Sequence, residues 1–329
     1  MRRFLRYIFL LCAAIVLALA LVLGLGAAYV RHMAVQDRMA ASPRTGTYVD
    51  AGDTRIFVQE VGPKTAPAVV FIHGTGAWSE IWRPQMTLLA AKGYRAVALD
   101  LPPFGYSLPP ASGKYDKTAQ ARRILATLDS LGIQQAAFVA HSIGSSPLME
   151  AILQQPQRAS HLVLISPALG LDTPLTDGRD SGAQALLRKH WFGDALAESV
   201  FANPLYTDWL VKRFVAEKDK LTPGWVDRYR QPMAVRGYAD GVARWMPELL
   251  AGRTTLPSDT PEAYRRIAVP VDLIWGRDDQ ITPLAQGEHL HALITQSQLH
   301  VLAGGHVPMI EEPESLDQLL ASIFPDRHP

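Results

Sequence analysis

The pattern of apolar positions begins with one long uncharged run. Residues 7–30 are 24 consecutive uncharged and mostly apolar positions, which exceeds the roughly 20 residues that a helix needs to cross a bilayer. A cleaved secretory signal is the competing interpretation, but the apolar region of such a signal usually has about 7–15 residues. The pattern therefore predicts an uncleaved transmembrane anchor over residues 1–30.

The charges beside this run indicate its orientation. Arg2, Arg3 and Arg6 crowd the short segment before it, whereas the arginines that follow are spread over a longer stretch. The positive-inside rule then favours a cytoplasmic N-terminus, with the rest of the chain outside the cytosol, in a periplasmic or extracellular space. Residues 31–46 are polar and unpatterned, so we expect a linker between the membrane and a domain over residues 47–329.

The domain shows the periods of short strands and helices. Residues 48–62 alternate as a strand pair with Gly52 and Asp53 at the turn, and residues 68–74 form a continuous apolar run typical of a strand buried in a parallel sheet. Strand-like and helix-like segments then alternate, which predicts an α/β fold with a mostly parallel central sheet and helices on both faces. These segments are 94–100, 117–132, 136–142, 145–155, 161–168, 269–276, 284–294, 298–305 and 315–324.

The alternation is interrupted between about residues 169 and 266. Segments within this insertion resemble short amphipathic helices, and Thr222-Pro223 and Thr260-Pro261 have the residue types favoured at helix starts. We therefore expect a helical cap. Its tryptophans either pack the cap onto the domain or line an apolar ligand pocket. The helical segments are 184–192, 205–214, 222–230 and 241–250, and the tryptophans are Trp191, Trp209, Trp225 and Trp245.

Composition removes several classes of function. The 32 Lys and Arg residues nearly cancel the 31 Asp and Glu residues, so no basic surface is available for a nucleic-acid partner. The single cysteine, Cys12, excludes an intramolecular disulfide and a cysteine-based zinc cluster. His289 and His291 are two positions apart on a predicted helix and point apart, and no glycine-rich phosphate loop is present. We expect no metal and no cofactor.

Candidate chemistry begins at residues 140–144, Ala-His-Ser-Ile-Gly, where a predicted strand turns directly into a predicted helix. The pattern matches a nucleophile elbow, G-x-S-x-G, with alanine in the first small position. The sharp turn brings the two backbones together, so the positions two before and two after Ser142 must be small. A serine that begins a helix is also a common N-cap, and this motif alone leaves both roles open.

A serine nucleophile needs a base, and the base needs a carboxylate that fixes its tautomer. His306 lies in the loop after the last predicted strand, whereas His300 lies within that strand and is expected to pack there. Asp278 and Asp279 lie in the loop after the strand at 269–276. The chain order serine, aspartate, histidine is the one expected with a nucleophile elbow.

The reaction also needs donors for a developing oxyanion. Residues 73–76, His-Gly-Thr-Gly, close the strand at 68–74. Backbone amides in this loop, together with the amide of Ile143, could converge on a carbonyl oxygen, and one such donor is worth about 3 kcal/mol of transition-state stabilisation. Standing alone, the loop would be interpreted as an ordinary glycine turn.

In combination, these motifs resemble the α/β-hydrolase fold family from about Tyr48 to Phe324. The resemblance makes Ser142 the nucleophile, His306 the base, and the amides of Thr75 and Ile143 the oxyanion hole. The matching segments, in chain order, are HGTGAWSEIW, ALDLPPFGYS, VAHSIGSSPLMEAI, WGRDDQITP and AGGHVPMIEEPE.

The same resemblance selects the triad acid. Asp279 lies three residues after Gly276 and four before Pro283, as in the family pattern G-x-x-D-x-x-x-P. Asp278 is the first alternative, and Asp172 is a more remote one. Two positions depart from the family, since Ala140 and Pro103 stand where glycine is usual, and we expect neither to abolish the chemistry.

The residue types then favour one reaction. Relatives of this fold that open epoxides or remove halides attack with aspartate, whereas this elbow offers serine, so attack on an acyl carbon follows. We expect hydrolysis of carboxylic esters, and the anchor and apolar cap suggest a small apolar, lipid-derived ester, similar to the substrates of membrane-bound monoacylglycerol lipases. A thioesterase, a lactonase, a carbon–carbon bond hydrolase and a ligand-binding protein without turnover remain alternatives.

Overall fold

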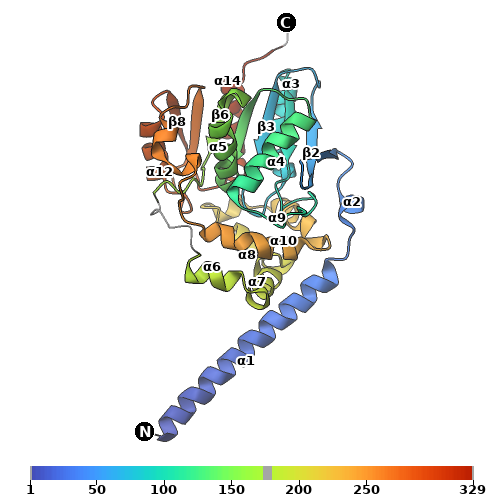
Figure 1. Cartoon of the computed structure of the whole chain (residues 1–329), viewed down its shortest axis with the longest axis vertical. Coiled ribbons are helices and arrows are strands. Elements are labelled where there is room, and N and C mark those ends of the chain that lie inside the picture. The colour runs from blue at the N-terminus through green and yellow to red at the C-terminus, as the bar shows by residue number, and fades with distance from the viewer. Residues whose placement is uncertain (1, 173–179, 328–329) are drawn as a thin grey trace.

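An eight-stranded sheet forms the centre of the domain, in the order β1-β2-β4-β3-β5-β6-β7-β8 (Figure 1). The computed structural model describes residues 2–172 and 180–327. The first two pairings, β1 with β2 and β2 with β4, are antiparallel, and the others are parallel. This confirms the predicted mostly parallel sheet. The strands are β1 (Gly46–Asp50), β2 (Arg55–Val61), β3 (Ala68–Ile72), β4 (Arg95–Leu99), β5 (Ala136–His141), β6 (Ala159–Ile165), β7 (Val271–Gly276) and β8 (Ser297–Leu302).

Helices cover both faces, which is why the central strands are apolar at successive positions. In β3, Val70 and Ile72 pack into the core shared with α4, α5 and α12, whereas Val69 and Phe71 pack into the core shared with α3 and α14. Because neighbouring side chains point to opposite faces of a strand, each face needs its own apolar set. The helices outside the cap are α3 (Arg83–Ala91), α4 (Lys117–Ser130), α5 (Ser145–Gln154), α12 (Leu284–Leu293), α13 (Pro308–Glu311) and α14 (Pro313–Ile323).

The insertion between β6 and β7 is a cap of short helices over the carboxyl ends of the parallel strands (Figure 1). Thr222 and Thr260 are N-cap residues followed by proline, as predicted. The segment predicted as one helix over 241–250 is shorter, because α10 ends before Pro247, which lacks the amide that would continue it. The described cap helices are α6 (Gly182–Leu187), α7 (His190–Leu196), α8 (Thr207–Val211), α9 (Pro223–Arg230), α10 (Tyr238–Trp245) and α11 (Pro261–Tyr264).

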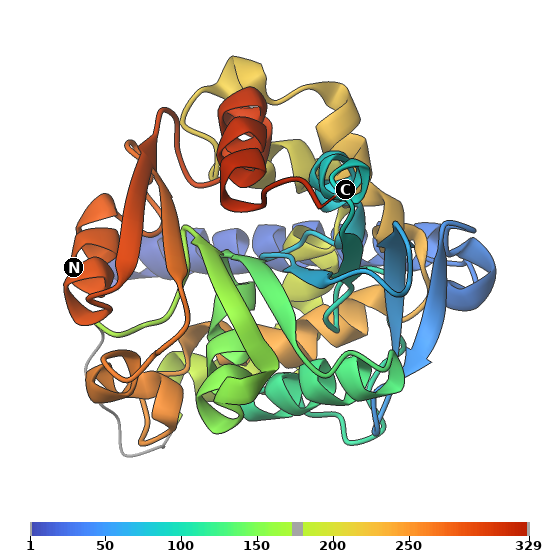
Figure 2. The same cartoon turned by 90° about the horizontal axis from the view of Figure 1, so that it is seen from above.

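The N-terminal helix α1 (Arg2–Met33) is long and apolar enough to cross a membrane. Its last turns lie beneath the cap, as Figures 1 and 2 show. The Arg31 guanidinium donates two hydrogen bonds of 2.8 Å to the Glu198 carboxylate, and the Ser199 hydroxyl donates to the Leu23 carbonyl at 2.6 Å. Helix and cap are therefore in direct contact.

The segment that we predicted to be a linker also contacts the domain. The backbone of Gln36 exchanges hydrogen bonds with Ala234 and Arg236 of the cap. Arg38, in the short helix α2 (Arg38–Ala41), is buried and donates to the carbonyls of Gly105 and Ser107, each at 3.1 Å. Residues 36–38 are thus held against the domain surface, which no local sequence pattern indicated.

The predicted turn at Gly52 and Asp53 joins β1 and β2 and carries a partly buried ion pair. Gly52 has a φ of 85°, in the left-handed region that favours glycine. Asp53 accepts two hydrogen bonds of 2.8 Å from Arg123, whose side chain is 1% exposed. These bonds from Arg123 lower the pKa of Asp53 to about 2.

We expect Asp53→Asn to lower the free energy of unfolding at pH 7 by roughly 1–2 kcal/mol, because it leaves the Arg123 charge without its partner. An unfolded aspartate has a pKa of about 3.9. The folded value is lower, so this stabilisation is present above pH 4 and is lost as the pH falls towards 2. Denaturant titrations of both proteins at pH 7 and near pH 2 measure this difference, with the exposed Asp219→Asn as a control. A difference in the free energy of unfolding that is equally large at both pH values would contradict a stabilising ion pair between Asp53 and Arg123.

Candidate active site

The backbone at Ser142 makes a sharp turn between β5 and α5. Ser142 has a φ of 53°, an uncommon value for a residue other than glycine. The N-cap positions in this turn are His141, whose side chain makes no capping bond, and Gly144, so Ser142 is not an N-cap residue. The Ser142 hydroxyl instead donates to Nε2 of His306 at 2.7 Å. This contact distinguishes the geometry of a nucleophile from that of a helix cap.

The elbow also explains its small residues. A Cβ atom on Gly144 would overlap the backbone carbonyl oxygen of His73, where β3 ends. Ala140 is fully buried and lies opposite Ile72 of β3 in the parallel register. A side chain at position 144 would therefore push the turn away from the end of β3, and a larger side chain at position 140 would overpack the buried core.

We expect Gly144→Ala to destabilise the domain by about 1–3 kcal/mol, because the new methyl group meets a backbone atom that cannot rotate away. Gly182→Ala, at the start of α6, is the matched control, since no atom of the described residues lies within 4 Å of the place that its methyl group would occupy. Its effect should stay within about 0.5 kcal/mol. Thermal unfolding of both variants measures the contrast, and equal melting temperatures would show that the elbow is not closely packed.

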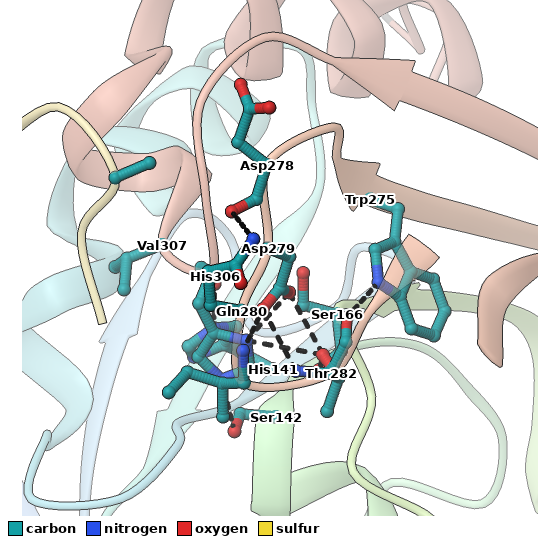
Figure 3. A network of polar contacts seen from close by, with 12 residues as sticks. His141, Ser142, Ser166, Trp275, Asp278, Asp279, Gln280, Thr282, His306 and Val307 are labelled. Atoms are coloured by element: carbon teal, nitrogen blue, oxygen red, sulfur yellow. Dashed lines mark hydrogen bonds and ion pairs between the residues drawn. The ribbon is translucent and has the colours of Figure 1, made fainter. Parts of the chain in front are cut away.

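Three side chains from distant parts of the chain meet at this turn (Figure 3). His306 contacts Ser142 through Nε2, and its Nδ1 donates to Oδ2 of Asp279 at 2.8 Å. All three residues are buried. With its Nδ1 proton held by a carboxylate, the imidazole presents the Nε2 lone pair to the serine hydroxyl, which is the arrangement that a general base requires.

Asp279 is held in its ionised form by several donors. Its Oδ1 accepts from the amides of Ile281 and Thr282 at 2.8 and 2.9 Å, and its Oδ2 accepts from the Thr282 hydroxyl at 3.0 Å. Burial alone would raise the pKa of Asp279. The hydrogen bond and charge of His306, together with these amides, lower the pKa by more than burial raises it, so the net shift is downward. Sequence reasoning missed Thr282, although a hydroxyl three residues after the acid was an available signal.

The two alternative acids lie elsewhere. Asp278 is exposed and its carboxylate points away from the imidazole (Figure 3), while its amide donates to the Gly304 carbonyl at 2.9 Å. Asp172 pairs with Nδ1 of His289 at 2.8 Å. Of these three acids, Asp279 alone contacts His306 in the described part of the chain.

The backbone of His306 is fixed from two sides. Its carbonyl accepts from Nε2 of His141 at 2.8 Å, and its amide donates to the carbonyl of Phe214, a cap residue, at 3.1 Å. Burial, with a smaller repulsion from His306, lowers the pKa of His141 to about 3, so His141 stays neutral. The domain and the cap thus both position the candidate base, and the cap contribution was not predicted.

The loop predicted to hold the oxyanion lies beside the nucleophile. A Cβ atom on Gly74 would lie 3.0 Å from Cβ of Ser142, so the loop that carries Thr75 is adjacent to the turn that carries Ser142 and Ile143. His73 fixes this loop, since its Nε2 accepts from the Leu101 amide at 2.9 Å and its Nδ1 donates to the Gly74 carbonyl at 2.8 Å. Burial lowers the pKa of His73 to about 4, which keeps the ring neutral.

A cavity of about 80 Å³ adjoins this loop, and a second cavity of about 320 Å³ shares part of its wall. Trp245 lines the first cavity and packs edge-on against Phe104, with ring centroids 4.7 Å apart. Trp225 packs against the apolar core, whereas Trp191 and Trp209 are 73% and 50% exposed. Packing and lining both occur, but neither Trp191 nor Trp209 lines these two cavities. Residues common to both cavities are Lys117, Ile143, Ser146, Glu248 and Leu249.

Comparison with known proteins defines the class that this fold and site indicate. The sequence profile of the family described as alpha/beta hydrolase fold matches residues 67–313. The chain therefore belongs to the α/β-hydrolase fold family.

Individual relatives are moderately similar in sequence. The chain is 29% identical over 260 residues to the uncharacterized hydrolase YugF of Bacillus subtilis, covering 78% of this chain and 89% of that protein. It is 29% identical over 299 residues to 2-hydroxymuconate semialdehyde hydrolase of Pseudomonas sp. strain CF600 (86% and 95%), and 26% identical over 264 residues to 3-oxoadipate enol-lactonase 1 of Acinetobacter baylyi (80% and 91%). These names describe hydrolases that cleave different bonds.

Solved structures share the fold. A structure described as a membrane phospholipase A, a novel bacterial virulence factor, has a TM-score of 0.65 and 24% identity, and the match covers 98% of this chain and 97% of that one. An esterase from Exiguobacterium antarcticum has a TM-score of 0.66 and 24% identity, with coverage of 85% and 99%. Because the first match spans nearly the whole chain, it includes most of α1.

Proposed function

We propose that the protein is a membrane-anchored serine hydrolase that cleaves carboxylic esters through an acyl-enzyme intermediate. The observation that carries the proposal is the continuous hydrogen-bonded series from Ser142 through His306 to Asp279 at a nucleophile elbow. A protein that only binds ligands has no need of all three groups in this geometry.

The groups act in two half-reactions. Ser142 Oγ attacks the ester carbonyl carbon while Nε2 of His306 takes its proton, and Asp279 stabilises the resulting imidazolium. The negative oxygen of the tetrahedral intermediate accepts from the amides of Thr75 and Ile143, each worth about 3 kcal/mol. The carbon–oxygen bond then breaks, and the imidazolium protonates the departing alcohol. Water, deprotonated by His306, releases the acid from Ser142 and regenerates the enzyme.

The wall of the cavity favours a neutral, apolar ester. Lys117 is the one lysine or arginine that lines the smaller cavity among the described residues, and it is paired with Asp259. The cation that could bind an anionic substrate in this cavity is therefore already paired. The apolar side chains of Phe104, Trp245 and Leu249 suit an acyl chain instead. We infer a lipid-derived ester, in line with the resemblance to membrane-bound monoacylglycerol lipases and with the likeness to the membrane phospholipase A.

The membrane anchor and its orientation belong to the same proposal. Helix α1 crosses the bilayer with the arginine-rich N-terminus in the cytoplasm, and the domain lies in the periplasm or outside the cell.

Hydrolysis of carbon–carbon bonds is the second candidate, because several relatives are named for it, including one that is 29% identical over 86% of this chain.

A fluorophosphonate probe tests for the nucleophile. Labelling of the full chain that disappears in Ser142→Ala supports the serine hydrolase, and folded protein that is never labelled contradicts it. A series of para-nitrophenyl esters of rising chain length, assayed in detergent micelles beside 2-hydroxymuconate semialdehyde, then separates the two reactions. Faster turnover of the semialdehyde would overturn the ester assignment, and preference for short soluble esters would overturn the lipid assignment.

A further inference from the structure

Large apolar side chains are exposed mainly on the cap. Outside the first 41 residues, most of the large hydrophobic residues that are exposed in the described chain belong to this insertion, and only Ile281 and Val301 lie elsewhere. Contiguous apolar surface on a protein usually marks a site of interaction. We call this set the apolar cap face: Leu186, Trp191, Phe201, Leu205, Tyr206, Trp209, Leu249 and Leu250.

Part of this face lies directly against the membrane helix. A groove of about 540 Å³ separates α1 from α7, and it is lined by Ala20, Gly24 and Ala28 on one side and by Trp191 and Phe192 on the other. Beside the groove, α1 touches the turn that follows α7, Ala197–Phe201, since a Cβ atom on Gly26 would lie 3.0 Å from Cβ of Ser199. The ion pair between Arg31 and Glu198 closes its end.

These contacts determine the depth of the cap relative to a bilayer. The apolar run ends at Val30, and Ala20 lies ten residues before that end, which is about 15 Å along a helix. Side chains that line a groove with residues 20–28 must share their depth, which runs from the boundary of the hydrocarbon layer to about 15 Å inside it. Tryptophan is the residue type most typical of that boundary, and Trp191, which lines the groove, is 73% exposed here.

We propose that the apolar cap face is immersed in the outer surface of the bilayer that α1 crosses, so that lipid is its binding partner. The inference rests on the proposed membrane anchor. One pair on this face agrees with it, because the Arg213 guanidinium lies 4.7 Å from the ring centre of Trp209, and an aromatic ring with an adjacent cation suits the region between acyl chains and headgroups. The groove is also lined by His190, Asp194 and Glu198, of which Glu198 is paired with Arg31.

The immersed face also reaches the candidate active site. Leu249 is 40% exposed and lines both cavities next to Ile143. The turn that carries it, Met246–Leu250, is fixed to α6 by hydrogen bonds from Gln184 to Pro247 and from Arg188 to Glu248. Leu249 therefore links the cavity walls to the apolar cap face, and on this proposal we expect an ester to enter from the membrane rather than from water.

Site-specific fluorescence tests the location of the face in the full chain. Cys12 is the only cysteine, so Cys12→Ser provides a background for Trp191→Cys and Trp209→Cys, each labelled with an environment-sensitive fluorophore after reconstitution into phosphatidylcholine vesicles. Thr65→Cys is the matched control, because Thr65 is exposed in the loop before β3, at the opposite end of the sheet from the cap.

We expect brominated lipids to quench the labels at 191 and 209 severalfold more than the label at 65, and aqueous iodide to do the reverse. Equal quenching at all three positions would overturn the proposal. Using two cap positions keeps the test valid if one variant misfolds. Carbonate extraction of the vesicles reports separately on the anchor, and probe labelling of Ser142 reports on the hydrolase, so failure of either is distinguishable from failure of this inference.

Discussion

Replacing Ser142 by alanine is expected to lower kcat for ester hydrolysis by on the order of a million-fold while the domain stays folded. The reason is that the hydroxyl 2.7 Å from Nε2 of His306 is the only atom in this arrangement that forms the acyl bond. His306→Ala should cause a similar loss, and the double variant should be no worse than either single variant, because the two groups act as one unit.

Ser145→Ala is the matched control for this prediction. Ser145 lies three residues further on, is fully buried, and its hydroxyl has no hydrogen-bond partner. It should keep kcat near the wild-type value. Rates on one ester, together with thermal unfolding of every variant, measure these outcomes. Substantial turnover by folded Ser142→Ala, or additive losses in the double variant, would refute the assignment of the nucleophile and its base.

Asp279→Asn is expected to lower kcat about ten-thousandfold with little change in fold. An asparagine amide would donate to Nδ1 of His306, where the carboxylate now accepts at 2.8 Å. The imidazole would then carry its proton on Nε2, facing the serine, and it could not accept a second one. The loss therefore comes from the wrong tautomer as well as from the missing negative charge.

The neighbouring aspartate provides the control. Asp278→Asn removes an exposed carboxylate that points away from the site, and we expect near-normal turnover. Comparing kcat for the two variants on the same ester, at a fixed pH, measures the contrast. A larger loss in Asp278→Asn would show that spacing from Gly276 had identified the wrong acid.

Much of this arrangement was predictable because it depends on local signals. A strand covered on both faces must be apolar at consecutive positions, as β3 is, and a sharp turn must have small residues beside its serine, as Ala140 and Gly144 are. Loops that follow parallel strands meet at one edge of the sheet, which is why Asp278, Asp279 and His306 could be expected near one another from their places after β7 and β8. The choice of Asp279 over Asp278 came from the spacing in the family resemblance.

Other contacts depend on positions far apart in the chain and leave no periodic signal. The carbonyl of Phe214 that accepts from the His306 amide is a backbone atom, which any residue type would supply. The pairing of Arg31 with Glu198 joins residues 167 positions apart, and both look like ordinary surface charges in sequence. For the same reason, the buried position of Arg38 could not be foreseen in a segment that is polar and unpatterned.

The junction between α1 and the cap has a mechanical consequence. Two parallel hydrogen bonds at Arg31 and a close contact at Gly26 hold the domain against the helix. In the membrane-anchored protein that we propose, the domain would lean with α1, so bilayer thickness, which affects helix tilt, would change the angle between the cap and the membrane surface. Lipid composition would then change the orientation of the domain relative to the membrane without any ligand being bound.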